Sequence, residues 1–423
     1  MVTETVRALR PTDEDRERVK GSVADIVEMV RSGGDAAVRR LTARLDGVDV
    51  EQARVPAAAI KRSLKETSPG VLRALETLTE NLRATARETM PQPSRQVLAQ
   101  GQIVSTRPMP VDRAGVYAPG GRAAYPSSAV MALVPAQVAG VKEIAVCSPP
   151  GPDGLPSHAV LAACSLAGVE EVYAIGGAQA VAAMALGTET IRPVDVLVGP
   201  GNAYVAIAKR EVAQEGLVGV PSAFAGPSEV VVVADASVDP RYAAIDVIVQ
   251  AEHGPDGLAW LVGWDEAVLE AVEGEIARLV QANPRRREIE GTFAAGGHVV
   301  IVDDAASAIA VSNAIAPEHL ELMVRDPEAL LPLVRHAGAV FTGMWSPASL
   351  GDYVAGPSHV LPTFGTARFG EALTVADFQK HVHVVTATEA GLRALGPHVV
   401  TLAEEEGLAA HAQSVGLRLE GRP

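Results

Sequence analysis

Two short segments of this 423-residue chain carry side chains suited to metal binding or proton transfer. The first is Gln250–His253 (QAEH), which lies between Pro240, a typical first residue of a helix, and Gly254-Pro255, which would end one. Because residues three apart share one face of a helix, the Gln250 amide oxygen and the His253 imidazole could bind one metal ion. For this segment alone, a histidine that caps the helix or makes an ordinary hydrogen bond is the alternative.

The second segment is Pro317–Glu321 (PEHLE), in which Glu318 and His319 are adjacent. Glutamate and histidine are common proton-transfer side chains. Adjacent side chains diverge in a helix or strand, so both could reach one pocket only at the end of an element, and Pro317 indicates such an end. The alternative is a solvated glutamate beside a partly buried histidine.

A long segment rich in glycine and proline, Gly351–Thr363 (GDYVAGPSHVLPT), carries Asp352 and His359. Loops of this length are usually functional or disordered, and the apolar residues within this one argue against disorder, so we expect a role in a site. Glu406 and His411 lie further on, five residues apart. That spacing does not share a helix face well, so the local pattern alone predicts two surface residues.

Three glycine-containing turns each follow a predicted strand and could bring backbone N–H groups close to a phosphate. They are Tyr117–Gly121 (YAPGG), Gly176–Gln179 (GGAQ) and Gly199–Asn202 (GPGN). None has the G-x-G-x-x-G spacing, and each alone is most simply an ordinary strand-to-helix turn. Together they indicate a nucleotide cleft at the carboxyl ends of parallel strands.

These segments need a scaffold, and the pattern of apolar residues predicts one. Residues 21–92 have helical periodicity with a break at Gly33-Gly34, whereas short β runs alternate with helices from about Gly115 onward. Such alternation is typical of parallel sheets covered on both faces, and the number of strands indicates two α/β units. From about Leu373 the chain is predicted to be mostly helical, with a break at Gly396-Pro397 and a helix through 403–413. The predicted strands are residues 141–147, 171–175, 194–198, 229–234, 258–262, 298–302 and 338–342.

Composition excludes several classes of protein. The chain is 48% hydrophobic and 21% charged, an ordinary globular balance, and its length suits two or three domains. Its net charge of −15 argues against binding nucleic acid or anionic lipid. Cys147 and Cys164 sit in apolar stretches without a C-x-x-C motif, which indicates reduced core residues. No apolar run could span a membrane, and Met1–Arg10 lacks the apolar core of a signal peptide, so we expect a cytoplasmic protein.

Taken together and in order, eight segments resemble the histidinol dehydrogenase family over roughly residue 100 to the end. Any one of them would be weak evidence, whereas eight in the same order are specific. They are GVYAPGG at 115–121, GGAQA at 176–180, VGPGN at 198–202, AGPSE at 225–229, VQAEHGPD at 249–256, APEHLEL at 316–322, GDYVAGPSHVLPT at 351–363 and EGLAAH at 406–411.

The resemblance implies an oxidoreductase that converts L-histidinol to L-histidine through L-histidinal with two NAD, at the end of histidine biosynthesis. It implies one zinc ion per subunit, which anchors the substrate rather than activating water. The implied zinc ligands are Gln250, His253, Asp352 and His411, all of which also lie at the substrate. His319 would act as the acid/base, also touching the substrate, and Glu318 would activate water.

Further contacts follow from the same resemblance. Ser228, His359 and Glu406 match positions that touch the substrate. Tyr117, Gln179 and Asn202 match positions that touch NAD, which agrees with the glycine turns.

The expected fold is α/β, with two Rossmann-like parallel-sheet units, a helical N-terminal region and a helical C-terminal tail. The expected division is an N-terminal arm at 1–20, an α/β domain formed by 21–114 and 235–372 that carries most of the zinc and catalytic residues, an NAD-binding domain at 115–234, and a tail at 373–423. We expect a homodimer in which each tail completes the partner's site.

Two segments depart from the usual family pattern: residues 220–224, ahead of AGPSE, and Ser358, where asparagine normally precedes His359. Two other functions stay open. A related zinc- and NAD-dependent dehydrogenase of another polar alcohol would be expected to lose the contacts made by His359, Glu406 and His411. A non-catalytic nucleotide-binding protein would not need the Glu318-His319 pair or the four ligands.

Overall fold

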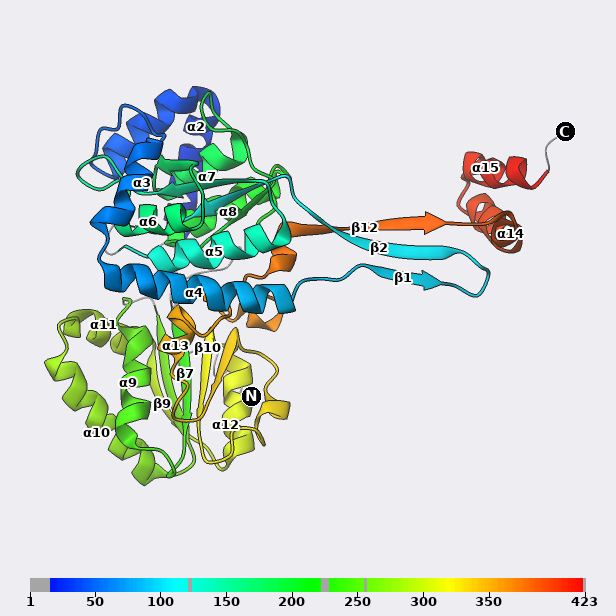
Figure 1. Ribbon diagram of the computed structural model, residues 1–423. Coiled ribbons are helices and arrows are strands. Elements are labelled where there is room, and N and C mark those ends of the chain that lie inside the picture. The colour runs from blue at the N-terminus through cyan, green and yellow to red at the C-terminus, as the bar shows by residue number, and fades with distance from the viewer. Residues whose placement is uncertain (1–15, 121–123, 222–227, 255–256, 421–423) are drawn as a thin grey trace. The chain divides into compact units, whose positions relative to one another are not determined.

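The computed structural model describes residues 16–120, 124–221, 228–254 and 257–420 (Figure 1). Most of the predicted N-terminal arm, Gly121, and much of the altered segment 220–224 fall outside these residues. The chain divides into two compact units. The first comprises the described residues of Met1–Thr89 and Asp112–Phe378, and the second comprises those of Met90–Val111 and Gln379–Pro423.

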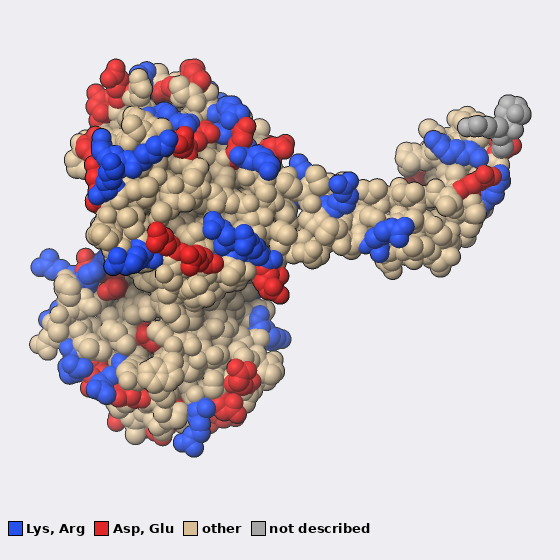
Figure 2. All heavy atoms as spheres, in the orientation of Figure 1, with Lys and Arg blue, Asp and Glu red and all other residues tan. Residues whose placement is uncertain are grey.

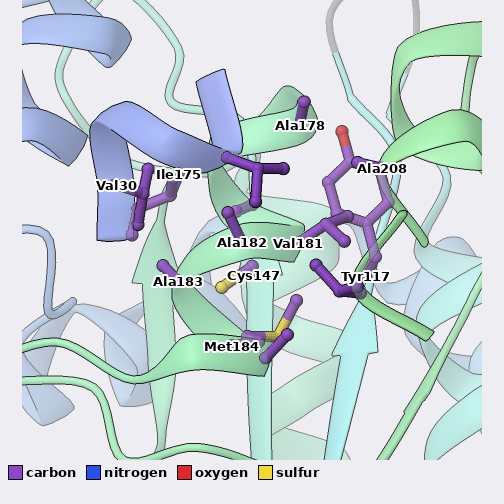
Figure 3. Packing of buried hydrophobic residues seen from close by; sticks show 14 of the residues in the cluster. Val30, Tyr117, Cys147, Ile175, Ala178, Val181, Ala182, Ala183, Met184 and Ala208 are labelled. Atoms are coloured by element: carbon purple, nitrogen blue, oxygen red, sulfur yellow. The ribbon is translucent and has the colours of Figure 1, made fainter. Parts of the chain in front are cut away.

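The first unit contains a four-stranded parallel sheet with strand order β5-β4-β3-β6. Its strands are β3 (Arg113–Tyr117), β4 (Glu143–Ser148), β5 (Val172–Ala174) and β6 (Val196–Val198). The helices of this sheet are α5 (Pro126–Ala139), α6 (His158–Leu166), α7 (Gly177–Leu186) and α8 (Ala203–Gln214). Helix α7 is rich in alanine, so it packs closely on its neighbours. Figure 3 shows its Ala178, Val181 and Met184 in one buried cluster with Val30 and Cys147.

The N-terminal helices pack on this same sheet. Helix α2 (Arg16–Leu45) contacts α7 and α8, α3 (Ala57–Glu66) contacts α6, and α4 (Pro69–Glu88) contacts α5. Helix α2 kinks at Gly34, whose φ of 48° favours glycine, so the break expected at Gly33-Gly34 is confirmed. These contacts join residues 21–88 to the four-stranded sheet, which differs from the expected grouping of 21–114 with 235–372.

The first unit also contains a five-stranded parallel sheet with order β11-β10-β7-β8-β9. Its strands are β7 (Glu229–Ala234), β8 (Leu258–Gly263), β9 (Gly297–Ile301), β10 (His319–Met323) and β11 (Ala339–Thr342). Strand β7 has four consecutive valines, Val230–Val233, all fully buried, as expected for a central strand covered on both faces.

Helices cover both faces of this second sheet. Helices α9 (Pro240–Ala251), α10 (Glu266–Ala282) and α11 (Arg286–Gly296) bury one face together with Met323, and α12 (Ala305–Ile315) buries the other face with Leu320 and Leu322. A short helix, α13 (Ala348–Tyr353), follows β11 and contacts α9. The predicted fold class, with two parallel-sheet units and helical ends, is thus confirmed.

The second unit is an antiparallel sheet followed by two helices. The sheet has the order β1-β2-β12, formed by β1 (Ser94–Val97), β2 (Ile103–Pro110) and β12 (Gln379–Thr386), none of which was predicted. These strands are mostly exposed and lack the buried valine runs of the parallel sheets. The remaining elements are α14 (Glu389–Glu405) and α15 (Ala409–Leu419).

Two predicted features of the C-terminal helices are wrong. Helix α14 continues through Gly396-Pro397, and Gly396 lets α15 pack closely there, since a Cβ would lie 2.7 Å from the tip of the Leu419 side chain. The predicted helix through 403–413 is interrupted at Gly407, whose φ of 71° is left-handed and ends α14.

The amino ends of β3 and β4 are joined by a buried cation. Arg113, with a side chain 6% exposed, lies 3.1 Å from Glu143 and donates to Glu171 over 2.9 Å. Burial would raise the pKa of Glu171, but Arg113, Tyr173 and Arg54 together outweigh this and lower it. Since that pKa is lower folded than unfolded, the pair stabilises the fold at neutral pH. The contribution is lost as the pH falls through the folded-state value.

Replacement of Arg113 by methionine should destabilise the fold, because it leaves the Glu171 carboxylate with only the more distant and more exposed Arg54 as a cation. Removing one partner of a buried ion pair typically costs about 3–5 kcal/mol, and urea denaturation should report a loss of that size. Arg192→Met is the matched control, since Arg192 also pairs with Glu143 but is 65% exposed. Its denaturation midpoint should stay at the wild-type value. A wild-type midpoint in Arg113→Met would mean that the pair does not stabilise the sheet.

The distribution of charge on the surface does not indicate a particular binding partner. On the face seen in Figure 2, acidic and basic side chains are interspersed, so no long stretch of it carries one sign of charge. Among the described residues, no helix combines the length and the apolar character needed to cross a bilayer. Cys147 and Cys164 are buried free thiols, as predicted.

Candidate active site

The predicted catalytic segments meet at the amino ends of the five-stranded sheet. His319 is the first residue of β10, and Glu318 directly precedes it. Helix α9 follows β7 and returns along the sheet, so Gln250 in its last turn lies at this same edge, with His253 just beyond. Asp352 lies on α13, not in a loop as predicted, because the helix extends from Ala348 to Tyr353 before the glycine- and proline-rich segment begins.

His319 is buried and contacted on both ring nitrogens. Its Nδ1 lies 3.1 Å from the backbone oxygen of Glu229 and 3.5 Å from Glu318 Oε2. Its Nε2 lies 3.3 Å from Asp352 Oδ1, and the ring stacks on Phe341 with centroids 5.9 Å apart. Burial alone would lower the pKa of His319, but the carboxylates of Glu318 and Asp352 outweigh it and raise the pKa well above its ordinary value.

The backbone of Glu229, at the start of β7, also holds Glu318. Glu318 Oε2 accepts a hydrogen bond of 3.0 Å from the Glu229 N–H, and its side chain is largely buried. Helix α12 ends at Ala316, whose φ is 53°, and the chain then enters β10. Glu318 and His319 therefore reach one region from the end of an element, as predicted.

Gln250 and Asp352 form the second pair of the site. Gln250 is almost fully buried and donates from Nε2 to Asp352 Oδ2 over 3.0 Å. Burial would raise the pKa of Asp352, but His319, His359 and Gln250 together lower it, so this carboxyl is ionised. His253 is exposed at the end of α9. No cluster of three or more His, Cys, Asp or Glu side chains placed to hold a metal occurs among the described residues.

His359 joins the segment after α13 to α5. Its Nδ1 lies 2.7 Å from the backbone oxygen of Asp352, and its Nε2 lies 2.9 Å from Ser128 Oγ. Burial lowers the pKa of His359, which favours the neutral ring. Ser228 is half-buried just before β7, and its backbone oxygen accepts from Leu258.

The three residues matched to NAD contacts lie at the carboxyl edge of the four-stranded sheet. Tyr117 ends β3, and its hydroxyl accepts a 3.1 Å hydrogen bond from the Gly177 N–H, while burial raises its pKa to about 12. Gln179 in α7 is buried and donates to Asp46 over 3.1 Å. Asn202 is exposed and caps α8 by accepting from Val205 over 3.2 Å. This edge is where parallel sheets bind nucleotides.

One glycine of these turns is required by close packing. Gly199 has a φ of 107°, and a Cβ there would lie 2.1 Å from the Tyr117 backbone oxygen. The two turns that follow β3 and β6 therefore touch through their backbones.

Comparison with known proteins identifies the family of this chain. A family model described as histidinol dehydrogenase matches residues 9–419. The chain belongs to the histidinol dehydrogenase family. The predicted family and enzyme class, a dehydrogenase, are confirmed at this level.

The similarity to relatives named histidinol dehydrogenase extends over almost the whole chain. A relative from a Synechococcus strain is 46% identical over 401 residues, covering 94% of this chain and 92% of its own. A relative from Cereibacter sphaeroides is 46% identical over 409 residues, covering 96% and 93%. The crystal structure of histidinol dehydrogenase from Elizabethkingia anophelis matches with a TM-score of 0.90 and 31% identity over 97% of each chain.

The remaining predicted site residues of this family member lie in the second unit. Glu406 follows α14, and His411 lies in the first turn of α15, where its N–H donates to Leu408 over 2.9 Å. Both side chains are exposed, as the local pattern alone predicted.

Sequence reasoning missed two residues that shape the site. Glu229 ends the AGPSE segment and was given no role, yet its backbone N–H contacts Glu318 and its backbone oxygen contacts His319. Asp46 lies at the end of α2 and hydrogen-bonds Gln179, but an aspartate after a helix carries no signal of a nucleotide cleft. Both act through contacts between segments distant in sequence, which spacing does not reveal.

Proposed function

We propose that this protein oxidises L-histidinol to L-histidine through L-histidinal, using two NAD, as the last steps of histidine biosynthesis. Family membership supports the overall reaction. The observation that carries it for this chain is the buried His319 set between the carboxylates of Glu318 and Asp352, with Gln250 hydrogen-bonded to Asp352.

The residues present fit one zinc ion per subunit. Amide and carboxylate oxygens with imidazole nitrogens are a donor set that zinc accepts, and Gln250 and Asp352 are already neighbours. Gln250, His253 and Asp352 would hold the ion together with His411 of a second copy of the chain. When bound, zinc would anchor the amine and imidazole nitrogens of histidinol and orient its alcohol.

His319 is suited to act as the base for the alcohol. Glu318 and Asp352 raise the pKa of His319, and zinc held by Asp352 would offset that carboxylate charge and favour the neutral ring. With Nδ1–H donating to the Glu229 carbonyl, the neutral ring presents its free lone pair at Nε2, the nitrogen that faces Asp352. The backbone oxygen of Glu229 thus selects the nitrogen that takes the proton as hydride leaves for NAD.

Glu318 is suited to activate water for the second oxidation. Its carboxylate is held by one backbone N–H and lies beside His319, so it keeps acceptor capacity for a water proton. Addition of that water to histidinal gives a hydrate, which can lose the second hydride. The alcohol step needs no water, so Glu318 acts in the aldehyde step only.

Contacts to substrate by Ser228, His359 and Glu406, and to NAD by Tyr117, Gln179 and Asn202, are part of the proposal. A substrate contact at His359 Nε2 would replace its present bond to Ser128. Residues 115–234, expected to form the NAD domain, contain all three cofactor residues, but Glu229–Ala234 at their end form β7 of the five-stranded sheet. Cytoplasmic location stays a prediction.

The overall reaction is tested by counting NADH against L-histidinol consumed. We expect two NADH per histidinol, loss of activity with a zinc chelator, and its return on adding zinc. Turnover of another polar alcohol in preference to histidinol would replace this function with that of a related dehydrogenase.

The two acid/base residues should separate the half-reactions. Glu318→Gln should slow oxidation of histidinal more than that of histidinol, since losing a general base typically costs ~10²–10⁴-fold. His319→Asn should nearly abolish histidinol oxidation while zinc content, measured by elemental analysis, stays at the wild-type level. Equal slowing of both steps in Glu318→Gln, assayed separately, or zinc loss in His319→Asn, would contradict these roles.

The proposed exchange of C-terminal tails can be tested with two inactive variants. In a dimer of His319→Ala with His411→Ala, tail exchange places both defects in one site and leaves the other site intact. Random pairing makes about half of the dimers mixed, so co-expression should restore about a quarter of wild-type activity. If mixed dimers form and stay inactive, each chain supplies its own His411 and the exchange model is wrong.

A further inference from the structure

A pair of buried carboxyl groups lies behind the site and is not used by the proposed reaction. Glu321 in β10 is fully buried, and Asp246 in α9 is 5% exposed. They sit in the layer where α9 packs on the sheet, a layer otherwise formed by aliphatic side chains such as Val232, Val247 and Met323. Buried acidic groups are costly in such a layer, so their contacts need an explanation.

The two carboxyl groups are close neighbours, since each one shifts the pKa of the other. Glu321 Oε1 accepts 3.0 Å from the N–H of Ala348, whereas Oε2 is buried and has no donor among the described groups unless a carboxyl proton supplies one. Two ionised carboxylates would repel each other and offer no donor, so the contact requires a shared proton. Burial, and then the neighbouring Asp246, raise the pKa of Glu321 well above its ordinary value, and burial also raises the pKa of Asp246.

Glu321 joins the three elements that carry the site. It lies two residues after His319, so the two side chains leave β10 on the same face. Its Asp246 partner lies one turn before Gln250 on α9, and its Ala348 partner lies one turn before Asp352 on α13. Helices α9 and α13 thus each present a site residue at the edge and, one turn behind it, a residue next to Glu321.

We propose that Glu321 and Asp246 share one proton and act as a positioning pair that fixes His319, Gln250 and Asp352 relative to one another for binding zinc. The inference rests on the proposed function only in taking Gln250 and Asp352 as zinc ligands. Glu321 has no contact with solvent, so it acts through the residues it holds. Partners behind metal ligands typically change metal affinity or activity by about 10–100-fold when removed.

Amide and alkyl replacements distinguish a shared proton from simple packing. Glu321→Gln keeps an acceptor for Ala348 and supplies N–H donors to Asp246, so its zinc affinity should stay close to wild type. Glu321→Met and Asp246→Leu fill the space without the hydrogen bonds, and each should weaken zinc binding by about 10–100-fold. Zinc affinity is measured by competition with a chromogenic chelator, without substrate. Met323→Leu, on the same face of β10, is the matched packing control and should bind zinc like wild type.

The shared proton has its own readout. A protonated carboxyl group absorbs infrared light at a different frequency from a carboxylate. The infrared difference spectrum, wild type minus Glu321→Gln, should therefore show the band of a protonated carboxyl group at neutral pH. This measurement needs neither zinc nor activity, and it applies even if the alkyl variants do not fold.

Three results would overturn the proposal. They are a folded Glu321→Met with wild-type zinc affinity, a folded Glu321→Gln with zinc affinity reduced as in the alkyl variants, and no carboxyl band lost on that replacement. A wild-type protein that binds zinc but does not oxidise histidinol would instead refute the proposed function and leave this test intact.

Discussion

The backbone N–H and C=O of Glu229 are the constraint on which the arrangement of the site depends. Its N–H binds Glu318 and its oxygen binds His319, so one backbone unit at the start of β7 holds both members of the acid/base pair. This works only because β10 is inserted beside β7 in parallel register, with His319 opposite Val230. Any shift in that register would move the side chains of Glu318 and His319 away from the backbone of Glu229. The buried valines of β7 therefore contribute to function by fixing the register.

Much of the fold could be predicted from the sequence because parallel strands buried on both faces leave a continuous apolar pattern. Strand β7 was predicted with its observed bounds, and the strands beginning near 258, 298 and 338 were predicted within one residue of theirs. Strand β10 was not predicted, since His319 and Glu321 interrupt its apolar run (HLELM). The two residues that interrupt the apolar pattern are the proposed acid/base His319 and the proposed positioning residue Glu321. Strands β1, β2 and β12 were missed because none has a buried apolar run, and because β12 pairs with β2 from a distant part of the chain.

The site could be predicted in part for a related reason. Residue types at short spacing indicated Gln250, His253, Glu318 and His319, whereas the grouping of Asp352 with them came only from the resemblance. The geometry that brings Asp352 to His319 depends on the contact between α13 and α9, which joins segments about a hundred residues apart. No sequence pattern indicated a role for Glu229, Asp246 or Glu321, because each acts through contacts between elements that are distant in sequence.

The charges around His319 give a physical reason for a bound cation. The carboxyl groups of Glu318 and Asp352 lie beside this imidazole, Glu321 is also near it, and Asp246 is the neighbour of Glu321. All four are largely buried, with the Asp352 side chain the most exposed of them at 21%. Even with one proton shared between Asp246 and Glu321, negative charge exceeds the single positive charge that the imidazole can carry. Buried charge that is not compensated destabilises a fold, and a divalent cation is the most compact compensation. Three of the four proposed ligands belong to the first unit, and the fourth belongs to the exposed second unit. In the proposed dimer, the arrival of His411 from the partner would complete the zinc site, and the bound zinc would compensate the buried negative charge.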